Sequence, residues 1–216
     1  MNRVKRLKLL NNIDLYPVTC QALSNGRTNL EVLDAVLAGG AKIIQLREKD
    51  RTKKDLYHLA VIFRKKTQAC NALLVINDHI DIALAVDADG VHLGQKDLPV
   101  NAARKIAPDL IIGASSHDLT QALQAEKDGA DYINIGPVFP TKTKKNAPEF
   151  IGTNAIKTIG PKLNKPFTVM GGINQTNIHE VLKAGARRVA MVTGITRAEN
   201  ITERVQALRK IILSYK

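Results

Sequence analysis

The sequence has 216 residues and no linker, which is enough for one large domain with a substantial core. No apolar run approaches the roughly 18 residues of a membrane span, so we expect no membrane partner. The net charge of +12 leaves nucleic acid, anionic surfaces and small polyanionic substrates open. Because no aromatic residues are interleaved with the basic clusters, we do not expect nucleic acid to be the partner.

The first residues, MNRVKRLKLLNN, are basic, and charges interrupt their few apolar positions. We take residues 1–12 as a basic N-terminal arm rather than a secretory signal, with a transit peptide as the alternative. Cys20 and Cys70 fit no metal or redox spacing. Two free thiols in a reducing cytosol is the simplest interpretation, and a cytoplasmic location follows from it.

Short apolar runs rich in β-branched residues recur through residues 13–216, with helical patterns between them. The eight runs are 15–19, 42–47, 73–77, 90–94, 110–115, 132–136, 167–172 and 188–194. Most are apolar throughout, which favours parallel strands buried on both faces. Eight strand–helix units predict an α/β fold, a single-domain (β/α)8 TIM barrel. An open doubly wound sheet is the alternative, weakened because no GxGxxG follows the first strand.

Active sites of such barrels gather on the loops after the strands. The second run continues into QLREKD, which supplies Gln45, Arg47 and Lys49. Arg47 and Lys49 are two residues apart and face the same side of an extended strand end. They would suit a phosphate or diphosphate, and a solvated charged loop is the alternative.

The third and fourth runs lead to acidic residues. Asn77 and Asp78 follow the third strand, and Asp97 follows the fourth. One carboxylate from each of two neighbouring loops is an arrangement that suits Mg²⁺, which keeps several waters and takes substrate phosphates as further ligands. Helix capping by Asp78 and a turn role for Asp97 remain the alternative.

The fifth and sixth strand ends carry hydroxyl groups and cations. Ser115 could donate a hydrogen bond, and His117 is either an acid–base group or structural. Thr141, Thr143 and Lys144 form a loop that could fix a phosphate and neutralise developing charge, with a mobile surface loop as the alternative.

The last two strand ends are rich in glycine. Gly171 and Gly172 allow a ligand to approach backbone N–H groups, and VTGI follows the eighth strand. Barrels often bind a phosphate through these two loops, although glycine pairs also serve packing. No nucleophile–base pair for covalent catalysis stands out.

As a set, QLREKD, IND, ADGVHLGQKD, GASSH, GADYINIGPVFPTKTK, GGI and VTGI resemble the thiamine-phosphate synthase family in order and spacing, from about Leu15 to Ile212. The resemblance implies an enzyme that joins a hydroxymethylpyrimidine diphosphate to a thiazole phosphate. Thiamine phosphate and diphosphate would form through a dissociative, carbocation-like step that uses Mg²⁺ on a barrel.

The same resemblance implies a role for each strand end. Asp78 and Asp97 look like the Mg²⁺ ligands. The residues that resemble contacts to the pyrimidine diphosphate are Gln45, Arg47, Lys49, Asn77, Ser115 and Lys144. The residues that resemble contacts to the thiazole phosphate are Thr141, Thr143, Gly172, Val192 and Thr193. Arg47, Lys49 and Lys144 are the expected catalytic cations.

The chain departs from the family pattern at three places. YPVTCQ lacks the acidic residue that often follows the threonine, His79 stands where arginine is common, and VTGI replaces a Ser-Ala pair. A thiazole tautomerase-like relative is the nearest alternative, but such relatives typically lose the aspartate of GQKD, which is present here as Asp97. A non-catalytic binding or regulatory protein is the other alternative, and assembly into a homo-oligomer stays open.

Overall fold

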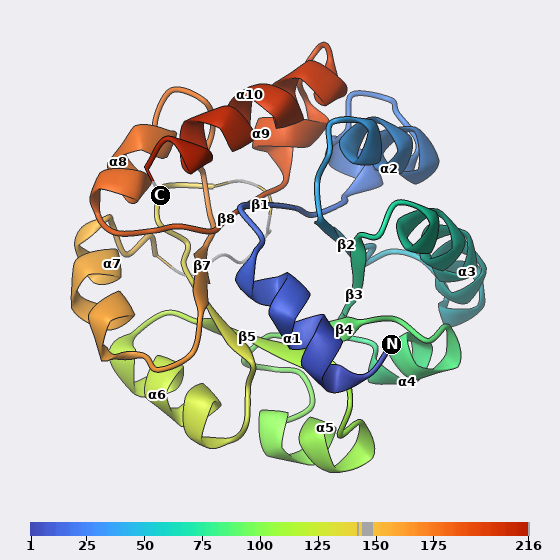
Figure 1. The fold of residues 1–216 in the computed structure, drawn as a ribbon, viewed down its shortest axis with the longest axis horizontal. Coiled ribbons are helices and arrows are strands. Elements are labelled where there is room, and N and C mark those ends of the chain that lie inside the picture. The colour runs from blue at the N-terminus through green and yellow to red at the C-terminus, as the bar shows by residue number, and fades with distance from the viewer. Residues whose placement is uncertain (142, 144–148, 216) are drawn as a thin grey trace.

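Short buried strands alternate with covering helices along almost the whole chain (Figure 1). The structure is a computed structural model, and it describes residues 1–141, 143 and 149–215. The strands within these residues are β1 (Leu15–Pro17), β2 (Ile43–Leu46), β3 (Leu73–Asn77), β4 (Gly90–Leu93), β5 (Ile111–Ser116), β6 (Tyr132–Ile135), β7 (Phe167–Val169) and β8 (Val189–Met191). The α-helices are α1 (Arg3–Asn11), α2 (Asn29–Ala38), α3 (Lys53–Ala69), α4 (Ile80–Ala85), α5 (Val100–Ile106), α6 (Leu119–Lys127), α7 (Asn154–Ile159), α8 (Ile178–Lys183), α9 (Thr193–Thr196) and α10 (Ile201–Leu213). Two short 3₁₀ helices, η1 (Gln21–Leu23) and η2 (Gly160–Lys162), complete the described elements.

All pairings in the sheet are parallel, and its order is β1-β8-β7-β6-β5-β4-β3-β2. The sheet closes between its two ends, because a parallel bridge joins Val18 to Gln45 and the Thr19 N–H donates to the Gln45 carbonyl at 3.0 Å. Helices surround the ring of strands in Figure 1. The predicted (β/α)8 barrel is confirmed.

Two predicted strands end three residues earlier than expected, the largest differences from the predicted runs. The run 167–172 leaves the sheet after Val169, because Gly171 and Gly172 take left-handed φ angles of +105° and +63°. The run 188–194 leaves it after Met191, and the chain turns into α9 at Thr193. At both places the sequence beyond the strand forms loop or helix that lines the site.

The helices begin at residues with suitable caps and bury one face. Thr28 and Glu31 form a capping box at the start of α2, and the Thr52 side chain accepts from the Asp55 N–H at the start of α3. The main apolar core lies between helices and sheet, and a second cluster fills the barrel interior around Tyr16 and Tyr132. None of the described helices combines the length and apolarity that a bilayer crossing requires.

Residues 1–12 contain α1, which lies across the centre of the ring of strands in Figure 1. Leu10 is buried in the interior cluster. The Arg6 side chain is 5% exposed and pairs with Asp89 at 3.4 Å, while Arg3 pairs with Asp131 at 2.5 Å. The two arginines of this stretch therefore help to dock α1 onto the barrel.

Asp89 and Asp131 belong to a set with Asp14 that we call the aspartate belt. Each belt residue is buried and directly precedes a strand, so the belt marks the amino face, the end of the barrel where strands begin. The opposite end, where strands finish, is the carboxyl face.

Candidate functional site

A cavity opens on the carboxyl face and is lined by residues from all but the first of the strand ends. The predicted site residues that line it are Gln45, Arg47, Lys49, Asn77, Asp78, Asp97, Ser115, Thr141, Thr143, Gly172, Val192 and Thr193. Lys144 lies outside the described residues. Loops that are far apart in sequence therefore converge on one cavity, as the barrel architecture dictates.

Asp78 and Asp97 lie side by side at one side of this cavity. Asp78 takes a left-handed backbone conformation with φ of +62°, which aspartate tolerates better than most residues. Burial raises the pKa of Asp97, and the neighbouring Asp78 carboxylate raises it further. Two carboxylates this close repel each other unless a cation or a proton lies between them.

The alternative roles for these aspartates are only partly met. His79, not Asp78, is the residue before α4, and no side chain caps that helix. Asp97 does stabilise its turn, because its Oδ2 accepts from the Gly94 N–H at 2.7 Å. The Lys49 ammonium pairs with Asp78. Helix capping therefore does not account for Asp78, whose carboxylate already meets one cation, the Lys49 ammonium.

The carboxylate pair supplies two of the oxygen ligands that a divalent cation needs. Among the described residues, no group of three His, Cys, Asp or Glu side chains gathers to hold a metal. Two carboxylates with water and phosphate oxygens as the remaining ligands fit the preferences of Mg²⁺.

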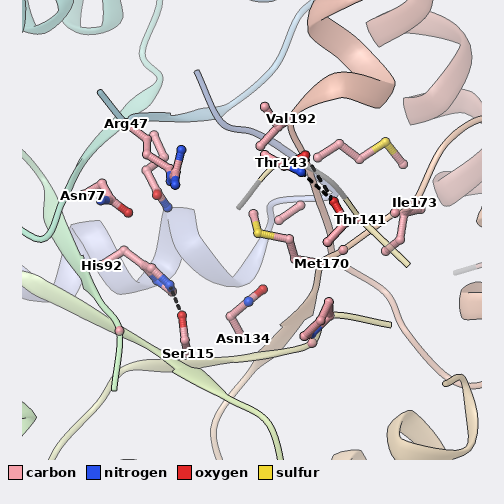
Figure 2. A pocket seen from close by; sticks show the side chains of 18 of the residues that line it. Arg47, Asn77, His92, Ser115, Asn134, Thr141, Thr143, Met170, Ile173 and Val192 are labelled. Carbon is pink, nitrogen blue, oxygen red and sulfur yellow. Dashed lines mark hydrogen bonds between the residues drawn. The ribbon is translucent and has the colours of Figure 1, made fainter. Parts of the chain in front are cut away.

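The loop after β2 brings a cation to the same side. The Arg47 N–H donates to the fully buried Thr19 Oγ1 at 2.9 Å, which fixes this loop against the end of β1. The Arg47 side chain is half-buried and reaches the cavity beside Asn77 in Figure 2. A guanidinium held in this way suits a phosphate oxygen pair.

The opposite side of the cavity carries two threonine hydroxyls among apolar side chains and glycines. Thr141 Oγ1 donates to Thr143 Oγ1 and accepts from the Thr143 N–H, both at 3.2 Å. Val192 lies on this side in Figure 2 as well. A side chain at Gly172 would lie 2.5 Å from the Pro140 carbonyl oxygen, so only glycine fits between the two loops. Hydroxyls with close backbone approach are typical of a phosphate site.

The floor of the cavity contains polar residues that the sequence interpretation did not select. The Gln45 amide donates to Tyr16 Oη at 3.1 Å, and Tyr16 Oη is 3.0 Å from Tyr132 Oη. This series of hydrogen bonds continues through His92, whose Nδ1 is 2.9 Å from Tyr132 Oη and whose Nε2 is 2.9 Å from Ser115 Oγ (Figure 2). Gln45 and Ser115, two predicted contacts, are thus joined through the barrel interior.

Local packing explains how the Tyr132 ring fits into this series of hydrogen bonds. A side chain at Gly113 would overlap the Tyr132 ring, at 2.0 Å from its Cζ, so the glycine makes room for the ring. Burial raises the pKa of Tyr132 well above its usual value, which keeps the phenol a neutral hydrogen-bonding group. The sequence signal for these floor residues was the presence of Tyr16, His92 and Tyr132 within otherwise apolar runs.

His117 has a structural partner. Its Nδ1 lies 2.5 Å from the Gly136 carbonyl oxygen, and its N–H donates to Gln121 Oε1 at 3.0 Å. The histidine also lines the cavity. It therefore links the loop after β5 to the end of β6 and forms part of the cavity wall.

Comparisons with known proteins agree on one family. The family model described as thiamine monophosphate synthase matches residues 15–195. A thiamine-phosphate synthase of Dictyoglomus turgidum is 41% identical over 217 aligned positions, covering 100% of this chain and 97% of that protein. A thiamine-phosphate synthase of Lawsonia intracellularis is 44% identical, covering 93% of each chain.

Solved structures give the same result. A thiamine phosphate pyrophosphorylase from Pyrococcus furiosus superposes with a TM-score of 0.87 at 39% identity, covering 98% of both chains. A 3-hexulose-6-phosphate synthase shares the fold alone, with a TM-score of 0.68 at 19% identity. With the family model matching most of the sequence and the barrel, cavity and strand-end motifs in agreement, the chain belongs to the thiamine monophosphate synthase family.

Proposed function

We propose that this protein condenses a hydroxymethylpyrimidine diphosphate with a thiazole phosphate to give thiamine phosphate and diphosphate, with Mg²⁺ held by Asp78 and Asp97. The observation that carries the proposal is the division of the cavity. Arg47 and Asn77 lie on one side, where Asp78 follows Asn77 in the chain and Asp97 lies beside Asp78. The hydroxyl residues Thr141 and Thr143 lie on the other side (Figure 2). Such a cavity accommodates two phosphorylated reactants with their reactive ends together.

On the acidic side, the pyrimidine diphosphate would contact Arg47, Lys49 and Asn77. Bound Mg²⁺ would supply neutralisation of the charge that develops on the diphosphate. Arg47 and Lys49 act on the same charge, because the bond between the pyrimidine methylene carbon and the diphosphate oxygen breaks with both electrons going to oxygen. Lys144 is expected to join them, although it lies outside the described residues.

On the other side, Thr141, Thr143 and Gly172 would bind the thiazole phosphate, together with the backbone at Val192 and Thr193. The thiazole nitrogen then shares its lone pair with the pyrimidine methylene cation, and the new carbon–nitrogen bond forms. The nitrogen carries no proton to lose, so the protein needs no strong base. Positioning and charge stabilisation supply the catalysis.

The competing functions receive less support. Asp97 and the hydroxyl loop, which a tautomerase-like relative would typically lose or replace, both line the cavity. A non-catalytic binding protein would not need the paired carboxylates. Small phosphorylated molecules are therefore the proposed partners, while a cytoplasmic location and a homo-oligomeric state stay predictions.

The direct test is an assay of the purified protein with both phosphorylated precursors, with and without Mg²⁺. We expect thiamine phosphate and diphosphate in equal amounts, and loss of product when a chelator removes the metal. Binding of both precursors by the folded protein without any turnover would contradict the proposal.

A further inference from the structure

Asn134 places an amide on the cavity floor that none of the roles above uses. The residue lies in β6, is 7% exposed and lines the cavity (Figure 2). In the parallel register it pairs with Ser115 on β5 and with Thr168 on β7. Paired residues of parallel strands project to the same face, so these three side chains form a row on the inner wall.

Thr168 fixes the orientation of the amide. Its hydroxyl, fully buried, donates to Asn134 Oδ1 at 2.8 Å. The acceptor end of the amide is therefore occupied, and the Nδ2 donors point away from Thr168. Across the described residues, no hydrogen bond from Nδ2 is found, and Nδ2 is not among the buried atoms sealed off without a partner. The donors are therefore open to the cavity.

The position of this donor on the cavity floor indicates which part of a bound substrate would accept its hydrogen bond. Phosphates would be held by the loops at the cavity mouth, so a ring that reaches between them lies nearest the floor. Ser115, adjacent to Asn134, is on the side expected to hold the pyrimidine. The apolar side chain of Met170 lies nearby in Figure 2 and suits a ring face. A nearly buried donor without a partner favours a ring with an acceptor nitrogen over a ring without one. When a ring without an acceptor binds, the amide loses its hydrogen bonds to water and gains no hydrogen bond in return.

We propose that Asn134 donates a hydrogen bond from Nδ2 to a ring nitrogen of the bound pyrimidine and so helps to select this substrate. Thr168 is the positioning residue that holds the amide in the donating orientation. The inference rests on the proposed function for the identity of the ring.

The first experiment measures binding of the pyrimidine diphosphate with Mg²⁺ and without the thiazole phosphate, by calorimetric titration. Asn134→Ala is expected to raise its Kd about five- to tenfold, the effect of one neutral hydrogen bond. Asn134→Asp keeps the shape but replaces the donors by acceptors, and about a hundredfold loss is expected. The KM for the thiazole phosphate should change less than about twofold. An unchanged pyrimidine Kd in both variants would overturn the inference.

Thr168 provides a matched pair. Thr168→Val removes the hydroxyl at nearly constant volume, so the amide can turn its oxygen to the cavity, and about a threefold weaker Kd is expected. Thr168→Ser keeps the hydroxyl and should restore wild-type binding. If both variants weaken binding equally, packing rather than amide orientation is responsible, and the positioning role is wrong.

Substrate analogues test the donor directly. Each ring nitrogen of the pyrimidine diphosphate is replaced in turn by C–H, and both analogues are titrated into wild type and Asn134→Ala. One analogue should bind wild type about tenfold more weakly than the parent compound and bind the variant without that loss. Equal losses in the two proteins for both analogues would sink the inference. Should Asn134→Ala fail to fold, Asn134→Ser is used in its place.

The outcomes separate this inference from the proposed function. If wild type turns over and Asn134→Ala binds the pyrimidine diphosphate with an unchanged Kd, only the inference about Asn134 is wrong. If the pyrimidine diphosphate binds tightly and this binding depends on Asn134, but no turnover occurs, only the proposed reaction is wrong.

Discussion

The two faces of the barrel use aspartate in opposite ways. On the amino face, Asp131 Oδ2 accepts from the Ile112 N–H at 2.9 Å and from Arg104 at 2.6 Å. Asp89 repeats the pattern, because its Oδ2 accepts from the Leu74 N–H at 2.9 Å and from Arg64 at 2.7 Å. On the carboxyl face, two carboxylates lie beside each other instead.

The comparison shows how one side chain serves stability at one end and ligand binding at the other. The belt carboxylates are 1–3% exposed, and their charge is balanced by arginines and backbone donors within the chain. The Asp78 side chain is 15% exposed, and its near neighbours include a second carboxylate. The Lys49 ammonium pairs with Asp78, so the negative charge of the two carboxylates is only partly balanced. Excess negative charge is costly for folding but creates affinity for a cation.

The largest expected effect comes from removing charge on the carboxyl face. Asp97→Asn keeps an oxygen that can accept from the Gly94 N–H but removes one carboxylate of the pair. We expect Mg²⁺-dependent kcat/KM to fall about a thousandfold, in line with the several kcal/mol that a metal ion contributes to charge stabilisation. Thermal unfolding should occur at or above the wild-type temperature without metal, since a repulsive charge is gone. A variant that loses activity and stability together would indicate a structural role for Asp97.

The same Asp→Asn change on the amino face should lower stability and leave activity nearly unchanged. Asp131→Asn removes the partner of Arg3 and Arg104 and should lower the free energy of unfolding by about 3 kcal/mol, as measured by urea denaturation. Well below the unfolding temperature, kcat and KM should stay within about twofold of wild type. A large loss of activity in the folded variant would show that the two faces are not independent.

The sequence predicted the carboxyl face better than the amino face for a physical reason. Strand ends meet at one rim whatever the register, so Asp78 and Asp97 could be placed together from their order alone. The role of Asp89 has no local sequence signal, because its partner Arg64 lies 25 residues away on a helix whose orientation no local pattern gives. Arg6 is likewise one of several basic residues in residues 1–12, and nothing in its sequence neighbourhood shows that its side chain is almost fully buried.

The cavity floor was missed for a different reason. His92 and Asn134 stand inside apolar runs, where a polar residue is hard to distinguish from an outward-facing one. Which side chains face inward depends on register, and register follows from the assembled sheet. The sequence therefore selected the strand-end residues, including Gln45 and Ser115, whereas His92, Asn134 and the tyrosines of the floor required the structure.

An intermediate effect is expected from adding metal. If Asp78 and Asp97 bind Mg²⁺, the folded state is stabilised by about 1.4 kcal/mol when the free ion is at ten times its Kd. Thermal unfolding of wild type should therefore shift upward with Mg²⁺, while Asp97→Asn should not shift. The belt variant Asp131→Asn is the matched control and should keep the full Mg²⁺ shift. Equal shifts in all three proteins would point to nonspecific ion effects and against the carboxylate pair.

The smallest effect concerns the two cysteines, which are also divided between the faces. Cys20 follows β1 on the carboxyl face and is half-buried, whereas Cys70 follows α3 on the amino face and is exposed. Burial raises the pKa of the Cys20 thiol, Glu48 raises it further, and Arg47 opposes them. The folded chain thus holds the Cys20 proton to higher pH than the unfolded chain, and this thiol lowers stability as the pH rises through its raised pKa.

Alkylation in a Cys70→Ser background measures this shift without interference from the exposed thiol. The rate for Cys20 in the folded protein should rise with pH at higher values than for the same thiol in urea, because only the thiolate reacts. Glu48→Gln should move the folded profile back toward lower pH, since it removes one of the two causes. If the Glu48→Gln profile coincides with that of the parent, burial alone sets the thiol pKa. The Glu48 charge would then have no effect on the pKa of Cys20, and charge coupling on the carboxyl face would be limited to carboxylates as close as Asp78 and Asp97.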